Sequence, residues 1–228
     1  MLFVLFAFAI SIGQMDEALF DELITNGTGR VPYFVMFTKD DCPACKHAMP
    51  VFEDTENQAH GIAEFYTINT TANPNLTIRY EVFSLPTFGL FFRNNAIPFS
   101  GRRTIPGFNK FLMEEITMLL LPVNESWVSN GHKKVILFAK RRIPPTILTG
   151  AFGKFYRHGI DFGMTGNETL IQMFGNYSVP SWYFFNGEKG ESREGISQID
   201  KLYENISEFF SIEENKNEQT KKPDFDDL

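Results

Sequence analysis

The chain has 228 residues, of which 43% are hydrophobic, so it can bury one large core or two smaller ones without a network of cross-links. It carries 28 acidic and 21 basic residues, a net charge of −7 at pH 7, and no basic run. These values exclude nucleic acid as the main partner, because nothing in the sequence would neutralise a phosphate backbone. The 25 phenylalanines favour tightly packed sheets.

The amino-terminal segment is apolar from Leu2 to Ile10 and is followed by two small residues, Ser11 and Gly13, three and one positions before Gln14. It is too short to span a bilayer, and the small residues are typical of a cleavage site. The segment therefore predicts a secretory signal peptide over residues 1–13. A buried amino-terminal strand is the alternative.

Glycosylation acceptor sites of the form Asn-x-Ser/Thr are more frequent than chance predicts. Random placement of these residue types would give about two sites. The excess supports passage through a glycosylating compartment, and we expect a location in the lumen of the endoplasmic reticulum. The seven candidate acceptors are Asn26, Asn69, Asn75, Asn124, Asn167, Asn176 and Asn205.

The first half of the chain predicts helices and strands in alternation, followed by a hairpin and a closing helix. This order places a mixed sheet between helices, in a domain over residues 14–122. Helices are expected over residues 14–28, 42–59, 73–80 and 108–121, and strands over residues 31–37, 63–68, 86–92 and 97–100.

The second half repeats the same order, in a predicted domain over residues 126–212 that has no cysteine. Residues 213–228 are acidic and nearly free of apolar side chains, and we expect them to be a disordered tail. In the second domain, strands are expected over residues 134–139 and 160–164, and helices over residues 144–156, 168–174 and 199–210. Residues 177–185 repeat the arrangement around Pro86, and Asn186-Gly187 predicts a hairpin turn after them.

The only two cysteines, Cys42 and Cys45, follow a predicted buried strand directly. A disulfide between them closes a very small loop, so a purely stabilising role is poorly motivated. If Cys42 caps the next helix and Pro43 is its first residue, the positive helix end favours a Cys42 thiolate. Structural zinc is the alternative, but four ligands are needed and no suitable histidine pair exists, so we predict no metal. The pattern favours thiol–disulfide exchange.

Three segments together resemble the thioredoxin superfamily, and in particular the protein disulfide isomerase family. The Cys-Pro-Ala-Cys motif followed by Pro50 resembles the active-site helix of that family, with its kinking proline. The segment from Tyr80 to Thr87 resembles the stretch that ends in a cis-proline. The segment from Phe99 to Thr104 resembles the sheet edge whose arginine approaches the active site.

The same Cys-Pro-Ala-Cys variant is found in some thioredoxin-related transmembrane proteins. Because this sequence has no second apolar segment of spanning length, we expect no stable membrane insertion after signal cleavage.

The resemblance implies an α/β fold of two tandem thioredoxin-like domains, each with a central mixed sheet flanked by helices. It implies isomerase or oxidoreductase activity on unfolded or disulfide-containing secretory proteins, with Cys42 attacking and Cys45 resolving, and no cofactor beyond the dithiol. The second domain resembles non-catalytic domains that bind unfolded chains or partners; a spacer is the alternative. The residues expected to support the site or contact substrate are Pro43, Ala44, Leu85, Pro86 and Arg103.

Three residues depart from the family pattern. Met36 replaces a buried carboxylate beneath the disulfide, Asp41 replaces a tryptophan, and Ala44 replaces a histidine that stabilises the thiolate. We expect slow resolution unless Lys39, His47 or water replaces the carboxylate, and a reduction potential between roughly −180 and −270 mV. Arg102 or Arg103, of which Arg103 aligns better, is expected to offset Asp41 by approaching the site.

Two further functions stay open. One is a redox-weak chaperone or adaptor that binds unfolded glycoproteins through the second domain, and the other is a reductase that serves a few dedicated partners. The last four residues, 225–228, resemble a degenerate retention signal for the endoplasmic reticulum. A solvated acidic tail is the alternative reading of that segment.

Overall fold

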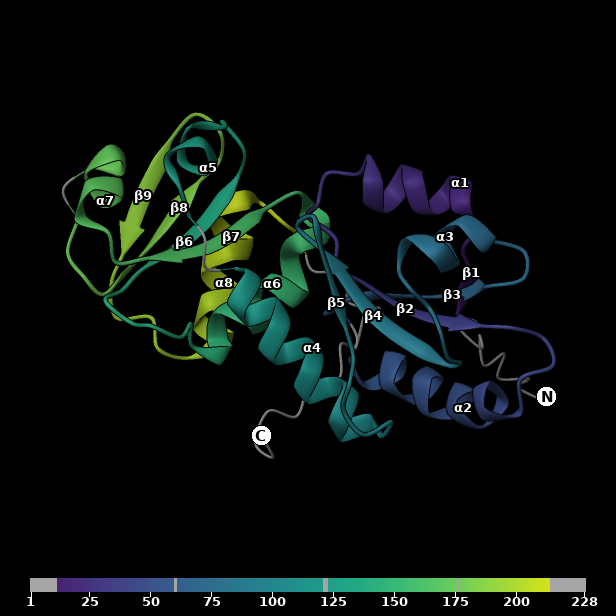
Figure 1. Cartoon of the computed structure of the whole chain (residues 1–228). Coiled ribbons are helices and arrows are strands. Elements are labelled where there is room, and N and C mark those ends of the chain that lie inside the picture. The colour runs from purple at the N-terminus through teal and green to yellow at the C-terminus, as the bar shows by residue number, and fades with distance from the viewer. Residues whose placement is uncertain (1–11, 60, 121–122, 176, 214–228) are drawn as a thin grey trace, which may run out of the picture.

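The computed structural model describes residues 12–59, 61–120, 123–175 and 177–213. Two sheets lie side by side, each with helices on both faces (Figure 1). The first has the strand order β1-β3-β2-β4-β5 and the second the order β7-β6-β8-β9. Both sheets combine parallel and antiparallel pairs, so the predicted α/β fold with two thioredoxin-like domains is confirmed.

The first sheet is organised around β2 (Tyr33–Thr38), which pairs in parallel with β3 (Glu64–Asn69) and antiparallel with β4 (Thr87–Phe92). All residues of β2 but the last are buried, which explains its continuous apolar sequence. The edges are β5 (Asn95–Pro98) and β1 (Gly13–Gln14). The sequence did not predict β1, because two residues carry no periodicity.

Two layers of helices enclose this sheet. On one face lie α2 (Pro43–Gln58), which runs through Pro50, and α4 (Ile105–Leu119). On the other lie α1 (Glu17–Phe20), continued by a π-helical turn over Asp21–Thr25, and α3 (Pro74–Arg79). The helix predicted over residues 14–28 is thus shorter than expected.

The second domain repeats the arrangement. Its central strand β6 pairs in parallel with β7 and antiparallel with β8. Helices α7 and α8 have the predicted bounds, whereas α5 was not predicted. The elements are α5 (Glu125–Ser129), β6 (Lys134–Phe138), α6 (Thr146–Phe155), a 3₁₀ turn over Tyr156–His158, β7 (Asp161–Thr165), α7 (Glu168–Phe174), β8 (Ser181–Phe185), β9 (Gly190–Arg193) and α8 (Ile199–Phe210).

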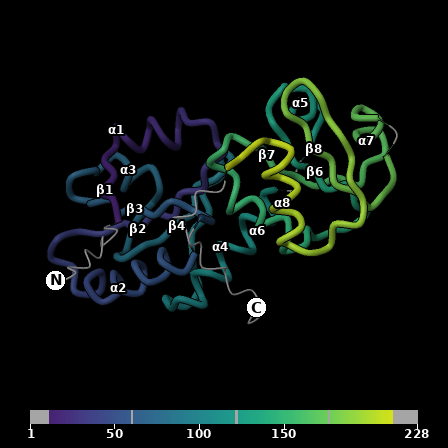
Figure 2. The backbone as a smooth tube through the Cα atoms, turned by 180° about the vertical axis from the view of Figure 1, so that it is seen from behind, coloured from purple at the N-terminus to yellow at the C-terminus, as the bar shows by residue number. Residues whose placement is uncertain are grey.

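One hydrophobic core continues from the first domain into the second. Helices α4 and α6 pack against each other between the two sheets, as both views show (Figures 1 and 2). The rings of Phe92 and Phe152 lie 5.4 Å apart across this boundary. Gly61 permits the close approach: its φ is +91°, and a Cβ there would lie 2.9 Å from the carbonyl oxygen of Gly153. The domains therefore share buried apolar surface.

Polar contacts cross the same boundary. Arg93 and Asn94, with φ values of 49° and 61°, form the two-residue turn between β4 and β5. The Arg93 guanidinium donates to the carbonyl oxygens of Leu119 at 2.6 Å and of Phe162 at 2.9 Å. Burial lowers the pKa of Arg93, against the attraction of Asp161. Two ion pairs also join the domains, Arg30–Asp161 at 2.8 Å and Arg157–Glu64 at 2.7 Å.

Several sequence predictions concern residues that lie outside the described ranges. Most of the predicted signal peptide, the acceptor Asn176 and all but residue 213 of the predicted tail lie outside the described residues. Within the described ranges, no helix has the length and apolar composition needed to cross a membrane.

Candidate redox site

Cys42 lies where the central strand of the first sheet gives way to a helix. After β2 the chain passes through the exposed residues Lys39 to Asp41, and Cys42 then caps α2. Its sulfur accepts a hydrogen bond from the backbone N–H of Cys45 at 3.1 Å. Pro43 occupies the first helical turn, where its lack of an N–H costs nothing. This is the cap that the sequence predicts.

Cys42 and Cys45 are joined by a disulfide, with their Cα atoms 5.2 Å apart. Cys42 is 6% exposed and Cys45 is 2% exposed, so Cys42 is the more accessible residue of the pair. Pro43 and Ala44 are exposed between them and form the surface over the disulfide. Of the two cysteines, Cys42 therefore lies nearer to solvent.

The surroundings of the disulfide are apolar. Met36 is fully buried and belongs to the same cluster of side chains as both cysteines. Asp161 is the one buried carboxylate among the described residues, and it belongs to the second domain. Asp41 is exposed immediately before Cys42. No buried acid is therefore present in the described part of the first domain to relay a proton to Cys45.

Pro86 lies at the same edge of the sheet as Cys42. The register of β2 and β4 places Phe37 opposite Thr87, so the chain leaves β2 toward Cys42 where Pro86 leads into β4. The Leu85–Pro86 bond is cis, Leu85 packs against the core cluster that contains both cysteines, and Pro86 is buried.

Arg103 acts on the Pro86 segment. Its Nη2 donates to the carbonyl oxygen of Pro86 at 3.0 Å, and its guanidinium lies 5.9 Å from the centre of the Phe88 ring. Arg102 is exposed. The hydrogen bond places Arg103 as a support for the segment beside the disulfide.

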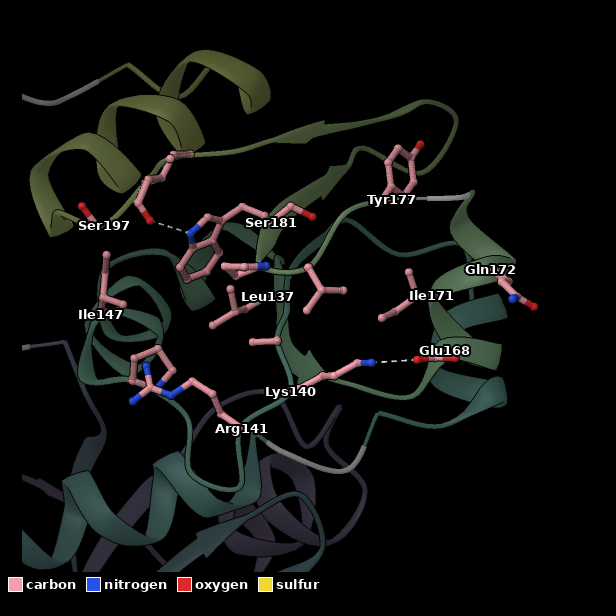
Figure 3. Close-up of a pocket in the computed structure, with 17 residues that line it drawn as sticks. Leu137, Lys140, Arg141, Ile147, Glu168, Ile171, Gln172, Tyr177, Ser181 and Ser197 are labelled. Carbon is pink, nitrogen blue, oxygen red and sulfur yellow. Dashed lines mark hydrogen bonds and ion pairs between the residues drawn. The ribbon is translucent and has the colours of Figure 1, made fainter.

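The corresponding edge of the second domain holds an open cavity of about 960 Å³ (Figure 3). It lies where β6 gives way to α6, and the cis Val179–Pro180 bond borders it. Its wall is apolar at Ile147, Ile171 and Trp182. An indirect signal for it in the sequence is the run of cations over residues 140–142, which stands in the place of the cysteine motif.

Two cations stand at the rim of this cavity. Lys140 pairs with Glu168 at 2.8 Å, and this hydrogen bond raises the pKa of Lys140 and lowers that of Glu168. Arg141 is exposed and makes no hydrogen bond or ion pair to another described residue. The indole of Trp182 is held by its hydrogen bond to the carbonyl oxygen of Ile196 at 3.0 Å. The cavity thus combines an apolar wall with an available positive charge.

The candidate glycan acceptors differ in exposure. Asn69 is half-buried and donates to Asp40 at 3.0 Å, and Asn205 is half-buried and accepts from Arg193 at 2.6 Å. The exposed acceptors are Asn26, Asn75, Asn124 and Asn167.

The sequence comparisons cover less than half of the chain. Residues 11–114 match the family model described as Thioredoxin. The thioredoxin of Staphylococcus aureus is 28% identical over 82 residues, which cover 36% of this chain and 75% of that protein.

Among solved structures, the J-Trx1 fragment of ERdj5 aligns with a TM-score of 0.42 and 20% identity, over 46% of this chain and 51% of that chain. Human ERp44 form II aligns with a TM-score of 0.45 and 13% identity, over 87% of this chain and 57% of that chain. This protein spans about half of the length of either structure. Residues 11–114 are thus similar to a thioredoxin domain, and the disulfide-bonded Cys42–Cys45 pair fits the Cys-x-x-Cys motif of thiol–disulfide oxidoreductases.

Proposed function

We propose that this protein exchanges disulfides with polypeptides of the secretory pathway, as an enzyme of the protein disulfide isomerase type. The observation that carries the proposal is the position of Cys42 at the amino-terminal end of α2, where its sulfur accepts the N–H of Cys45 at 3.1 Å. In the reduced protein, this N–H and the positive helix end stabilise a Cys42 thiolate, the form that attacks disulfides.

The reductive direction begins with a Cys42 thiolate and a substrate disulfide. Attack forms a Cys42–substrate disulfide and releases one substrate sulfur as a thiolate. The Cys45 thiolate then attacks the Cys42 sulfur, which forms the Cys42–Cys45 bond and releases the second substrate sulfur. Two electrons pass from the dithiol to the substrate, and an external dithiol restores the reduced pair. Oxidation of a substrate dithiol follows the same steps in reverse.

The proposed location is the lumen of the endoplasmic reticulum. The predicted signal peptide, the excess of glycosylation acceptors and the similarity of residues 225–228 to a retention signal support it. The four exposed acceptors among the described residues are accessible to a glycosylating enzyme.

A trapping experiment tests the redox proposal. In a Cys45→Ala variant, Cys42 attacks but no resolving thiol follows, so mixed disulfides should accumulate and disappear on reduction. A Cys42→Ala, Cys45→Ala variant is the control and should trap nothing. Absence of mixed disulfides in the single variant, in cells that secrete disulfide-containing proteins, would refute the proposal. Reduction of insulin and refolding of scrambled ribonuclease then distinguish a reductase from an isomerase.

The cavity of the second domain favours a second candidate function, the binding of unfolded polypeptides. Its apolar wall suits a hydrophobic side chain, and Arg141 at its rim suits a neighbouring carboxylate. In this function the second domain holds an extended segment while the cysteine pair contributes little.

Fluorescence tests this second function, because the chain has two tryptophans and only Trp182 lines the cavity. In a Trp127→Phe variant, Trp182 is the sole reporter. Titration with a peptide that combines leucine and aspartate should change its emission, and Arg141→Glu should weaken binding by about tenfold. Arg142→Glu makes the same charge change at a residue that does not line the cavity and should weaken binding less. Equal losses in both variants would contradict binding in the cavity.

A further inference from the structure

We propose that Phe83 determines substrate selectivity at the redox site, by contacting an apolar side chain of the polypeptide that brings its sulfur to Cys42. The proposal rests on the proposed thiol–disulfide exchange and adds a recognition residue to it.

The exposure of Phe83 is unusual within the described part of this chain. Its side chain is 91% exposed, the highest value among the large hydrophobic residues that are exposed there, and the others in that set are aliphatic. By contrast, Phe88, five positions later in the chain, is 1% exposed. An apolar contact that removes an exposed aromatic ring from water is energetically favourable.

The backbone on both sides of Phe83 is fixed. The N–H of Val82 donates to the carbonyl oxygen of Thr77 at 2.9 Å, and the Thr87 hydroxyl donates to the carbonyl oxygen of Ser84 at 2.6 Å. Val82 and Leu85 pack against the buried cluster beneath the segment. Phe83 is therefore presented outward by an anchored segment, which lowers the ordering entropy of a contact with it.

Phe83 lies within reach of a polypeptide attached at Cys42. It precedes Pro86 by three residues, a span of at most about 10 Å, and Pro86 shares the sheet edge with Cys42. Because Cys42 is only 6% exposed, a substrate sulfur must approach closely, which brings its flanking residues onto the surrounding surface. A small disulfide does not extend that far, so the occupant is a polypeptide with an apolar residue near its cysteine.

The test compares two peptides that each contain one disulfide and differ in one residue, leucine or serine, three positions from a cysteine. The full chain, recycled by dithiothreitol, should reduce the leucine peptide with a kcat/KM about tenfold above that of the serine peptide. Phe83→Ser should bring this ratio close to one, and Phe83→Leu should restore most of it.

Met118→Ser provides the matched control. Met118 is 51% exposed and lies near the carboxyl end of α4, whereas Arg103, just before α4, contacts Pro86. The length of α4 separates Met118 from the site by about 20 Å. This variant should keep the wild-type ratio.

Each outcome decides the proposal. An unchanged ratio in Phe83→Ser, an equal loss in Met118→Ser, or a wild-type ratio near one would overturn it while leaving the oxidoreductase function intact. A wild-type protein that reduces neither peptide would overturn both proposals. If sedimentation shows that Phe83→Ser dissociates a dimer while the ratio stays unchanged, the ring serves self-association and the substrate proposal is wrong.

Discussion

At the carboxyl end of its central strand, the first domain places Cys42 and Cys45, whereas the second domain places Lys140 and Arg141. The first edge is closed over a buried disulfide, and Pro86 beside it is buried. The second edge is open around a cavity of about 960 Å³, and Pro180 beside it is exposed. One architecture therefore carries a buried disulfide in one copy and an open cavity in the other.

The scaffold of the two edges is nevertheless the same. The residue after each cis-proline donates its hydroxyl to the backbone three residues earlier, from Thr87 to Ser84 and from Ser181 to Ser178, both at 2.6 Å. In each domain a further side-chain hydrogen bond connects this region to the segment before the last helix. The comparison shows that this support does not depend on the cysteines.

The largest expected effect is on disulfide exchange, which we assign to the sheet edge of the first domain and not to that of the second. Cys42→Ser should reduce disulfide turnover to background, because the remaining thiol, that of Cys45, belongs to a residue that is only 2% exposed. Binding of the leucine–aspartate peptide, followed by Trp182 emission, should be unchanged. Loss of both functions would show that the edges are not independent. The stability lost with the disulfide should be no more than about 2 kcal/mol, because the closed loop is so short.

The next prediction concerns the contact that joins the domains. Arg93→Ala removes two charged hydrogen bonds, to Leu119 and Phe162, and leaves both carbonyl groups short of a donor. The free energy of unfolding should fall by about 2–4 kcal/mol in urea titrations. Arg102→Ala, at an exposed position, should change it by less than about 0.5 kcal/mol. Equal effects would argue against a bridge at Arg93.

The hydroxyl groups of Thr87 and Ser181 allow the hydrogen bonds that support the two sheet edges to be compared directly. Ser181 is 2% exposed, whereas Thr87 is only half-buried. Ser181→Ala should therefore lower the free energy of unfolding by about 1.5 kcal/mol, and Thr87→Val by about 0.5 kcal/mol. Thermal unfolding of both variants measures the difference. A larger loss at Thr87 would mean that the first edge depends more on this bond than burial suggests.

The smallest effect is electrostatic and belongs to the first domain. Burial, followed by repulsion from Glu64 and Glu53, raises the pKa of Glu56 above its ordinary value of 4.5. The folded state thus holds this proton more tightly than the unfolded state, so the charged form lowers stability at neutral pH. Glu56→Gln should stabilise the protein at pH 7 by less than about 0.5 kcal/mol, because solvent screens the partly exposed group.

This gain should shrink as the pH falls to 4, where Glu56 becomes protonated. Urea midpoints at the two pH values measure it, and Glu188→Gln, at an exposed position, is the control. A gain that persists at pH 4 would assign the effect to packing.

Sequence patterns were sufficient to predict helices with a clear hydrophobic periodicity and the helix cap formed by a cysteine. The bounds of α7 and α8 agree with the apolar spacing, and the cap at Cys42 follows from the adjacent Pro43. Sequence patterns were insufficient where tertiary contacts determine the secondary structure. The two-residue strand β1 exists through pairing with Tyr66 and Thr67, and α5 has only five residues.

The same limit applies to the sites. Arg103 was expected to approach the site, and its hydrogen bond to the backbone oxygen of Pro86 could not be predicted, because a carbonyl acceptor leaves no trace in sequence. The second-domain cavity draws its lining from segments as far apart as Leu137 and Ser197, and only folding brings these together. The exposure of Phe83 could not be predicted from the sequence either. The order of apolar and polar residues before Pro86 does not assign Phe83 to the core or to the surface.

The central position of β2 has a consequence for the encounter between two sulfurs. The strand that leads to Cys42 is hydrogen-bonded along both of its edges, so Cys42 follows one of the most restrained backbones in the sheet. A recessed sulfur on such a support contributes no motion of its own to a collision. The polypeptide that reacts with Cys42 must therefore be the mobile partner in the encounter. Most of the conformational entropy lost on binding is then lost by that polypeptide.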